Sequence, residues 1–175
     1  LNTTLESIDR VTSELQDLVM RIRMVPLEQV FNRFPRLVRD IARRRGKKVN
    51  FIMRGAEVKV NRTVLVEIGE PILHLLRNAV DHGIESPEIR KKNGKPEEGV
   101  VKLTAERKGN KVIITVEDDG AGIDPEKIKK KALEKGIISE SEANSISTKQ
   151  LIDLIFLPGF STAEKVTETS GRGVG

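Results

Sequence analysis

The chain has 175 residues, the length of one ordinary domain with a short additional segment, and enough to bury a core without disulfides. Hydrophobic residues make up 37% and charged residues 33%, which favours a soluble globular protein over a disordered one. The absence of cysteine excludes disulfides, thiolate metal sites and cysteine nucleophiles, and two histidines are too few for a histidine-rich metal site. No apolar run approaches the roughly 20 residues of a membrane helix and no signal peptide opens the chain, so we expect a cytoplasmic protein. The first residue, Leu1, indicates a piece of a longer one.

The net charge of +5 raises the question of an anionic partner. The densest basic cluster consists of Arg36, Arg39, Arg43, Arg44, Arg45, Lys47 and Lys48. A solvated helix end, whose cations suit the negative end of the helix dipole, is the simpler interpretation. The chain has no Trp or Tyr to serve as stacking platforms for bases, so we expect no nucleic-acid partner.

The first 24 residues carry a seven-residue repeat of apolar side chains. The repeat has two interleaved series, interrupted once by a threonine: Leu1, Ile8, Leu15 and Ile22, and Leu5, Thr12 and Val19. This pattern predicts a coiled-coil helix of about three heptads, whose apolar stripe needs a partner helix. Because no second heptad helix follows, the partner is either a preceding helix or a helix of a second chain.

Beyond Pro26, which ends the first helix, apolar periodicity and breakers predict mixed helices and strands. We expect helices at 27–45, 61–81, 125–136 and 148–156, and strands at 49–53, 58–60, 100–106 and 112–117. Gly55 is the predicted turn between the first two strands, Gly109-Asn110 the turn of a hairpin, and Pro71 the site of a kink. Residues 163–175, rich in Ser, Thr and Gly, are predicted to form a mobile loop. Helices on one face of an antiparallel sheet give an α+β fold.

The helix around His74 has one apolar and one polar face. The polar face collects Glu70, His74, Arg77, Asn78, Asp81, His82 and Glu85. An ordinary amphipathic helix would show the same pattern, but this face holds both histidines of the chain and an asparagine, which helices disfavour. His74 and Asn78 are four residues apart, so both can reach one cation. Imidazole and amide donors suit a hard, partly hydrated ion such as Mg²⁺ if phosphates complete its shell.

Two glycine-containing segments follow. Asp118-Asp119-Gly120-Ala121-Gly122 comes directly after a predicted strand, where a carboxylate and two glycines allow a flat ligand to approach the backbone, although a plain turn has the same pattern. Gly171-Arg172-Gly173-Val174-Gly175 offers backbone amides that can cradle phosphate. Lys127 and Lys131, on the helix between the two segments, can extend ammonium groups toward phosphates, with solvated surface lysines as the ordinary alternative.

In this order and spacing, the asparagine helix, DxGxG, a Phe-containing loop and GxGxG resemble the ATP-binding domain shared by histidine kinases, gyrase, Hsp90 and MutL. Four stretches are similar more narrowly to the CheA family of chemotaxis histidine kinases: LVMRIRMVP (18–26), FNRFPRLVRD (31–40), LHLLRNAVDHGIE (73–85) and FLPGFST (156–162). The likeness covers essentially the whole chain. It implies a two-layer α/β sandwich of the histidine-kinase/Hsp90/gyrase type behind a long coiled-coil-like helix. Residues 1–24 would be part of a helical dimerisation domain, and residues 25–175 an ATP-binding kinase domain that is incomplete at its C-terminal end.

The resemblance also implies roles for single residues, with ATP and Mg²⁺ as cofactors. Asn78 would coordinate Mg²⁺ with His74 beside it, and Asp118 would accept the adenine amino hydrogen, which selects adenine over guanine. Gly120 and Gly122 would let the base approach. The phosphates would meet His82, Lys127, Lys131 and the amides of Gly173 and Gly175, while Asp81, Ser161 and Gly171 complete the cofactor-binding set. His74, Asn78 and Lys127 are the implied catalytic residues, and 157–172 the implied lid.

The implied activity is that of a protein histidine kinase in a two-component chemotaxis system. The γ-phosphoryl group of ATP would pass to a histidine on a separate phosphotransfer domain, because both histidines of this chain belong to the nucleotide site. A second copy would bind through the dimerisation helices. In the full protein, the implied partners are a response regulator, a coupling protein and chemoreceptors, which would make the cytoplasmic kinase receptor-associated. Because the family continues past the second glycine cluster, we expect this fragment to be incomplete and inactive alone.

Two alternatives belong to other functional classes. Related ATPases that hydrolyse ATP place a glutamate four residues before the asparagine as a base for water, and this chain has His74 there. An imidazole near the metal is a poorer base, which favours transfer to a protein over hydrolysis. A non-catalytic dimerisation and interaction module would explain the heptads alone.

Overall fold

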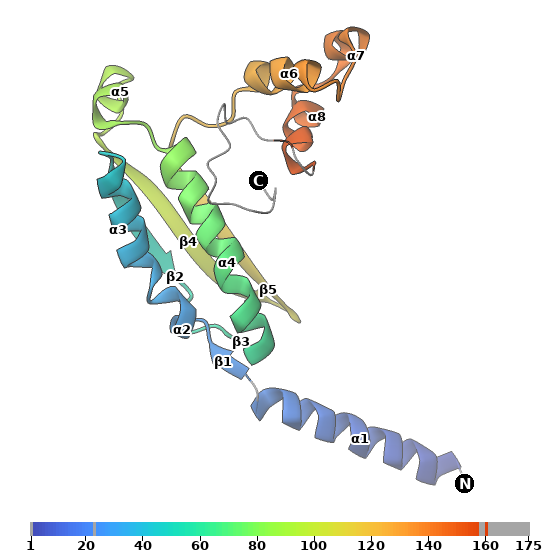
Figure 1. Ribbon diagram of the computed structural model, residues 1–175. Coiled ribbons are helices and arrows are strands. Elements are labelled where there is room, and N and C mark those ends of the chain that lie inside the picture. Colours follow the sequence, from blue (N-terminus) through green and yellow to red (C-terminus); the bar gives the residue numbers. More distant parts are fainter. Residues whose placement is uncertain (1, 23, 158–159, 161–175) are drawn as a thin grey trace. The chain divides into compact units, whose positions relative to one another are not determined.

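The computed structural model describes residues 2–22, 24–157 and 160 of the chain (Figure 1). The chain divides into two compact units, Leu1–Ala121 and Gly122–Gly175, each with its own apolar core. None of the described helices is both long and apolar enough to cross a membrane.

The first unit combines helices with a mixed sheet. Its helices are α1 (Asn2–Ile22), α2 (Glu28–Phe31), α3 (Phe34–Arg44), α4 (Arg62–Asn78), the π-helical segment η1 (Ala79–Gly83) and α5 (Pro87–Lys92). Its strands are β1 (Met24–Pro26), β2 (Lys48–Arg54), β3 (Lys59–Asn61), β4 (Glu98–Lys108) and β5 (Lys111–Asp118). The three-stranded sheet has the order β2-β4-β5, and β1 and β3 form a separate antiparallel pair.

The predicted hairpin is confirmed. β4 and β5 pair antiparallel from Val101↔Asp118 to Lys108↔Lys111. The two residues between the strands are Gly109 and Asn110, and Gly109 has φ +61°, in the left-handed region that glycine adopts without strain. The last residue of β5 is therefore Asp118, which places its carboxylate at the end of the sheet.

The first two predicted strands exist, with the turn at Gly55 between them, but they do not pair with each other. β2 lies parallel to β4, with Phe51 opposite Val101, and β3 pairs with β1 instead. A parallel pair needs a crossover connection, and here α4 supplies it. The predicted antiparallel sheet is therefore a mixed one, in which β2 lies parallel and β5 antiparallel to β4.

The predicted helix 27–45 is in fact two helices, α2 and α3, separated at Asn32 and Arg33. Pro35 lies in the first turn of α3, where its missing N–H costs nothing. In the interior of one continuous helix from 27 to 45, the same proline would lack a hydrogen bond and clash with the preceding turn. Met24–Pro26, predicted only as a break, forms β1. The short helix α5 was not predicted at all.

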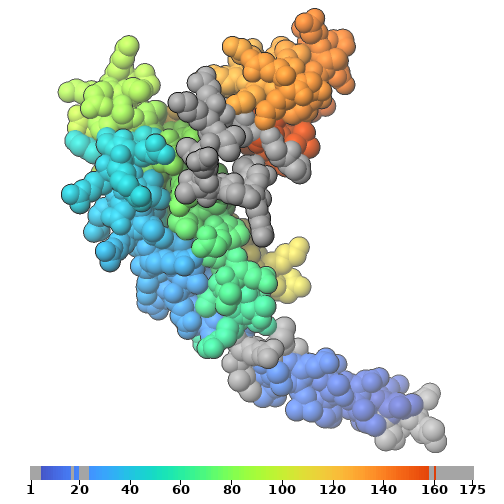
Figure 2. Space-filling view, viewed as in Figure 1, coloured from blue at the N-terminus to red at the C-terminus, as the bar shows by residue number. Residues whose placement is uncertain are grey.

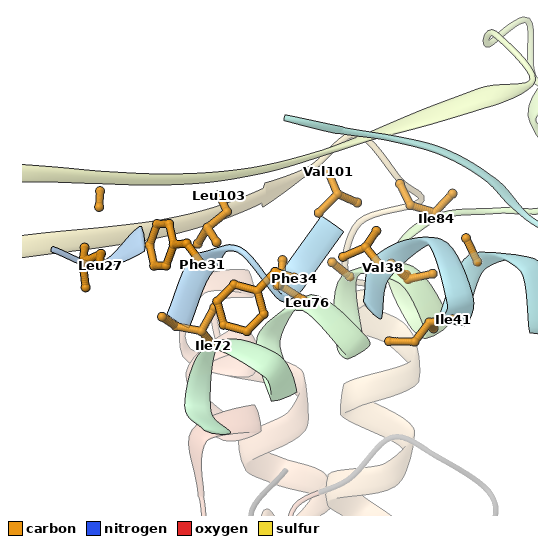
Figure 3. Packing of buried hydrophobic residues seen from close by; sticks show 14 of the residues in the cluster. Leu27, Phe31, Phe34, Val38, Ile41, Ile72, Leu76, Ile84, Val101 and Leu103 are labelled. Carbon is orange, nitrogen blue, oxygen red and sulfur yellow. The ribbon is translucent and has the colours of Figure 1, made fainter. Parts of the chain in front are cut away.

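The core of the first unit lies between the sheet and the helices that cover one of its faces (Figures 1 and 3). From α4, Leu65, Ile72 and Leu76 recur on one side of the helix and are buried. β4 contributes Val101 and Leu103, which alternate with exposed residues as expected of a strand with one buried face. Burial of each such side chain contributes about 1.5–3 kcal/mol. The arrangement confirms the predicted two-layer α+β fold.

Helix α1 spans Asn2–Ile22, and four of the apolar heptad residues on it are exposed. Leu5, Ile8, Leu15 and Val19 are 54–59% exposed. The partner helix that would cover this stripe stays a prediction.

The described part of the second unit, orange to red in Figure 2, is a small helical cluster. It contains α6 (Pro125–Glu134), α7 (Glu140–Ser145), α8 (Thr148–Asp153) and the 3₁₀ turn η2 (Leu154–Phe156). Asp124, Ser139 and Ser147 cap the three α-helices at their N-termini. Ile128, Leu151 and Phe160 are among its core residues. The prediction missed α7, and the predicted loop 163–175 lies outside the described residues.

Candidate functional site

The helix that carries the candidate residues changes its geometry at the candidate asparagine. The Asn61 side chain caps α4 by accepting the N–H of Thr63 at 3.0 Å, and the α-helix then runs to Asn78. From Ala79 the helix widens, and the N–H of Ile84 donates to the carbonyl five residues earlier at 2.8 Å. Single π-helical turns often occur at functional sites. His74 and Asn78 lie one turn apart on α4, and both are half-buried.

Two cations of the segment after α3 hold the widened turn. Arg45 donates from Nε to Oδ1 of Asp81 at 2.9 Å and from Nη2 to Oδ2 at 3.2 Å. The Nζ of Lys47 donates to the carbonyls of Val80 and Asp81 at 2.7 and 2.8 Å. Burial lowers the pKa of Lys47, although the charge of Asp81 opposes this shift. Asp81 is thus paired with arginine, while His82 is exposed on the same turn.

Asp118 meets η1 at a point where both segments have glycine. The N–H of Gly120 donates to Oδ1 of Asp118 at 3.0 Å, and the N–H of Ala121 donates to the carbonyl of Gly83 at 2.9 Å. A Cβ on Gly83 would lie 2.7 Å from Oδ1 of Asp118, and a Cβ on Gly120 would overlap the carbonyl of Gly83. The fold therefore brings the end of the asparagine-bearing helix against the predicted adenine-binding carboxylate.

The sequence analysis missed a buried arginine behind this loop. Arg90 of α5 has an exposed fraction of 0%. Its guanidinium donates to Oε2 of Glu85 at 3.0 Å and to Oδ2 of Asp119 at 3.0 Å. Ser86 caps α5 and Pro87 occupies its first turn, a start signal that was present in the sequence. A buried arginine cannot be inferred from that signal, because its partners are distant in the chain.

Glu85 is the buried acid of this group, with a side chain only 8% exposed. Burial alone would raise its pKa, but hydrogen bonds from Lys95 and Arg90 outweigh burial, and the pKa lies below its usual value. The distance from Lys95 Nζ to Glu85 Oε1 is 2.8 Å. Glu85 is therefore ionised and paired on both oxygens.

The donor set suits an adenine nucleotide and its magnesium ion. Among the residues that the structure describes, Oδ2 of Asp118 has no hydrogen-bond partner, so it can accept a hydrogen bond from a ligand. Its neighbours Gly83 and Gly120 have no side chains to block the ligand. The described ranges hold no group of three or more His, Cys, Asp or Glu side chains arranged for a metal. A cation at Asn78 would therefore need phosphate oxygens in its shell, which is how Mg²⁺ is commonly held with nucleotides.

The remaining predicted residues belong to the second unit. Lys127 and Lys131 lie on α6, and Gly122 has φ +73° with open space around it. Ser161, Gly171, Gly173 and Gly175 lie outside the described residues, as does the predicted lid except for Leu157 and Phe160. Phe160 is buried in the core of the second unit.

Comparison with known proteins defines the class. Residues 66–175 match the family described as histidine kinase-, DNA gyrase B-, and HSP90-like ATPase, and the chain belongs to this family. It is 51% identical over its whole length to "Chemotaxis protein CheA" of Bacillus subtilis, of which it covers 26%. It is 49% identical, again over its whole length, to "Sensor histidine kinase CheAY" of Helicobacter pylori, of which it covers 22%. The chain thus spans about a quarter of the length of these relatives.

Among solved structures, the chain is similar to a histidine kinase domain from Erythrobacter litoralis. The TM-score is 0.42 at 24% sequence identity, and the match covers 74% of this chain and 51% of the other.

Proposed function

We propose that this chain is the ATP-binding part of a chemotaxis histidine kinase, which transfers the γ-phosphoryl group of ATP to a histidine on a separate phosphotransfer domain. The similarity to chemotaxis kinases over the whole chain supports the proposal. The observation that carries it is the contact between the end of η1 and the loop after β5, which joins the Asn78 and Asp118 segments in one unit.

In this proposal, the base and the phosphates are bound by different elements. Asp118 accepts a hydrogen bond from the adenine amino group, and the adjacent Gly83 and Gly120 leave room for the flat base. Asn78 holds Mg²⁺ with its amide oxygen, and His74 lies one turn away on the same helix. Contributions from Lys127, Lys131 and the second glycine cluster rest on the family resemblance alone.

The chemistry required of the protein is mostly positioning. Bound Mg²⁺ supplies neutralisation of phosphate charge, while the protein orients the nucleotide and leaves the nucleophile to the acceptor histidine. Position 74 holds an imidazole rather than the glutamate of hydrolysing relatives, so this chain lacks that carboxylate base for water. Transfer to a protein is therefore favoured over hydrolysis.

Calorimetric titration with ADP, with and without Mg²⁺, tests the nucleotide site. We expect binding that Mg²⁺ strengthens, and we expect Asn78→Ala to abolish this strengthening and autophosphorylation of the full-length protein. Asn50→Ala, an exposed asparagine on β2, is the matched control and should change neither. Unchanged Mg²⁺ dependence in Asn78→Ala would reject the metal assignment.

Labelled ATP and a separate phosphotransfer domain distinguish a kinase from a hydrolysing ATPase. We expect the labelled phosphoryl group of ATP to appear on a histidine of the added phosphotransfer domain. Release of inorganic phosphate with no labelled protein would instead identify a hydrolase, and failure to bind ADP would leave only an interaction module.

A further inference from the structure

The loop after β5 is anchored from behind by one arginine. The Nε of Arg90 donates to the carbonyl of Pro96 at 2.7 Å, and Nη1 donates to Oε2 of Glu85 at 3.0 Å and to the carbonyl of Asp119 at 3.3 Å. Nη2 donates to Oδ2 of Asp119 at 3.0 Å. The planar fork of a guanidinium can serve acceptors in several directions at once, whereas an ammonium group acts as a point charge. Arg90 therefore fixes α5, Glu85 and the loop together.

Asp119 is held at every polar group. Its N–H donates to the carbonyl of Val100 at 3.1 Å, and its Oδ1 accepts the N–H of Val100 at 2.8 Å. Its carbonyl accepts from Arg90 and, at 3.1 Å, from Nζ of Lys95. The side chain thus continues the ladder by one step after β5 ends. Because Asp118 is the preceding residue, its backbone is fixed on both sides.

Lys95 extends the anchor to the glycine of the loop. Its Nζ donates to the carbonyl of Gly120 at 2.8 Å, as well as to Asp119 and Glu85. Two cations, Arg90 and Lys95, thus face two carboxylates, Glu85 and Asp119. Arg90 and Glu85 are the buried members of this group, and removal of either one leaves the other buried without its partner.

β4 leaves room for this group by carrying glycine beside it. A Cβ on Gly99 would lie 2.7 Å from Cγ2 of Ile84 and 3.3 Å from Nη1 of Arg90. A larger residue at position 99 would therefore overlap Ile84 and crowd the guanidinium of Arg90. A strand interior has no conformational need for glycine at this position, so the packing accounts for it.

We propose that Arg90 is a positioning residue for adenine recognition, acting through Asp119 on the carboxylate of Asp118. The inference rests on the proposed function, in which Asp118 accepts the adenine amino hydrogen. The glycine-containing loop by itself has wide conformational freedom. The four charged side chains behind it restrict that freedom and hold the carboxylate in the direction that distinguishes an amino group from the oxo group of guanine.

The ratio of the dissociation constants for GDP and ADP measures this role. General destabilisation weakens both nucleotides equally, whereas a displaced Asp118 carboxylate weakens ADP selectively. In the full-length protein, we expect Arg90→Lys to lower the ratio about tenfold, because a lysine keeps the charge but loses the fork, and a tenfold change equals about 1.4 kcal/mol. Lys48→Met is the control, since it breaks an exposed ion pair between the first residue of β2 and Glu97.

A second variant covers the possibility that Arg90→Lys fails to fold. Lys95→Met removes the bonds to Glu85 and to the carbonyls of Asp119 and Gly120 from a side chain that is 34% exposed. Arg90 remains the partner of Glu85 in this variant. Lys95→Met should also lower the ratio, while Lys48→Met should not. If the wild type selects ADP and the folded variants keep its ratio, the positioning role is overturned and the nucleotide site stands. If the wild type fails to prefer ADP over GDP, the adenine role of Asp118 is overturned, and this inference with it.

Discussion

At the scale of single residues, Gly83 and Gly120 are required by a contact between two segments, and not only by the approach of a ligand. The sequence predicted Gly120 as a place where a base comes close. The structure adds a second reason, because the carbonyl of Gly83 occupies the space of a Cβ at position 120. Because position 120 has no Cβ, the N–H of Ala121 can reach the carbonyl of Gly83 at 2.9 Å.

Gly120→Ala should therefore separate the two segments. We expect a loss of unfolding free energy of about 1–3 kcal/mol, typical of overpacking, together with a larger loss of ADP affinity than stability alone explains. Urea denaturation and calorimetry measure the two effects. Gly109→Ala is the control: its Cβ would meet open space, and its φ of +61° predicts a cost of about 1–2 kcal/mol with no change in ADP affinity. Equal ADP affinity in both variants would contradict the role of the contact.

Glu85 gives the first unit a predictable response to acid. Its pKa is lowered in the folded state from an ordinary value of 4.5, so the unfolded chain binds its proton more readily. The stabilisation is therefore complete above 4.5 and is lost as the pH falls through the folded pKa. We expect the free energy of unfolding to decline less between about pH 6 and pH 3.5 in Glu85→Gln than in the wild type.

The exposed Glu97 provides the comparison for this pH series. Its pKa is also lowered, chiefly by the hydrogen bond from Lys48, but both partners are about half exposed. Solvent screens such pairs, so Glu97→Gln should change the decline of the unfolding free energy with falling pH much less than Glu85→Gln does. An equal effect of the two substitutions would show that burial of Glu85 adds nothing.

At the scale of elements, local signals predicted the structure wherever partners are close in sequence. The β4–β5 hairpin follows from Gly109-Asn110, and α4 follows from its apolar face. The parallel pairing of β2 with β4 could not be predicted, because it is set by packing across a long crossover. In the candidate site, the polar residues of α4 and Asp118 were predicted from the sequence and stay predictions, whereas the burial of Arg90 was missed. Its charge resembles that of any surface arginine until its distant partners are known.

The π-helical segment η1 should depend on Lys47. Because Lys47 binds the carbonyls of Val80 and Asp81, Lys47→Met leaves two carbonyls at the end of the helix without their cation. We expect the amide of Ile84, which donates to Ala79, to exchange hydrogen faster, with local opening easier by about 1–3 kcal/mol. Lys48→Met changes the adjacent lysine, which is bound elsewhere, and should leave this amide protected. Unaltered exchange at Ile84 in Lys47→Met would show that η1 is held by its other contacts.

At the scale of the whole molecule, the chain places different tasks in parts with separate cores. The candidate residues His74, Asn78 and Asp118 lie in the first unit, and Gly122 and the candidate lysines lie in the second. Leu15 of α1 is 59% exposed, whereas core residues such as Leu76 are fully buried. An apolar stripe of this kind on a helix is typical of a surface that pairs with another helix. The second copy predicted from the heptads is the proposed partner.

Leu15→Lys should weaken self-association of the full-length protein through α1. Burial of one leucine contributes about 1.5–3 kcal/mol, and a symmetric pair of helices contains the residue twice. The dissociation constant of the dimer, measured by analytical ultracentrifugation, should therefore rise by about a hundredfold or more. Ser13→Lys, an exposed position of the same helix outside the two heptad series, adds the same charge and should leave the constant unchanged. If the two variants associate equally, the stripe pairs with a helix of its own chain, because a helix–helix contact between copies would not tolerate a lysine at its centre.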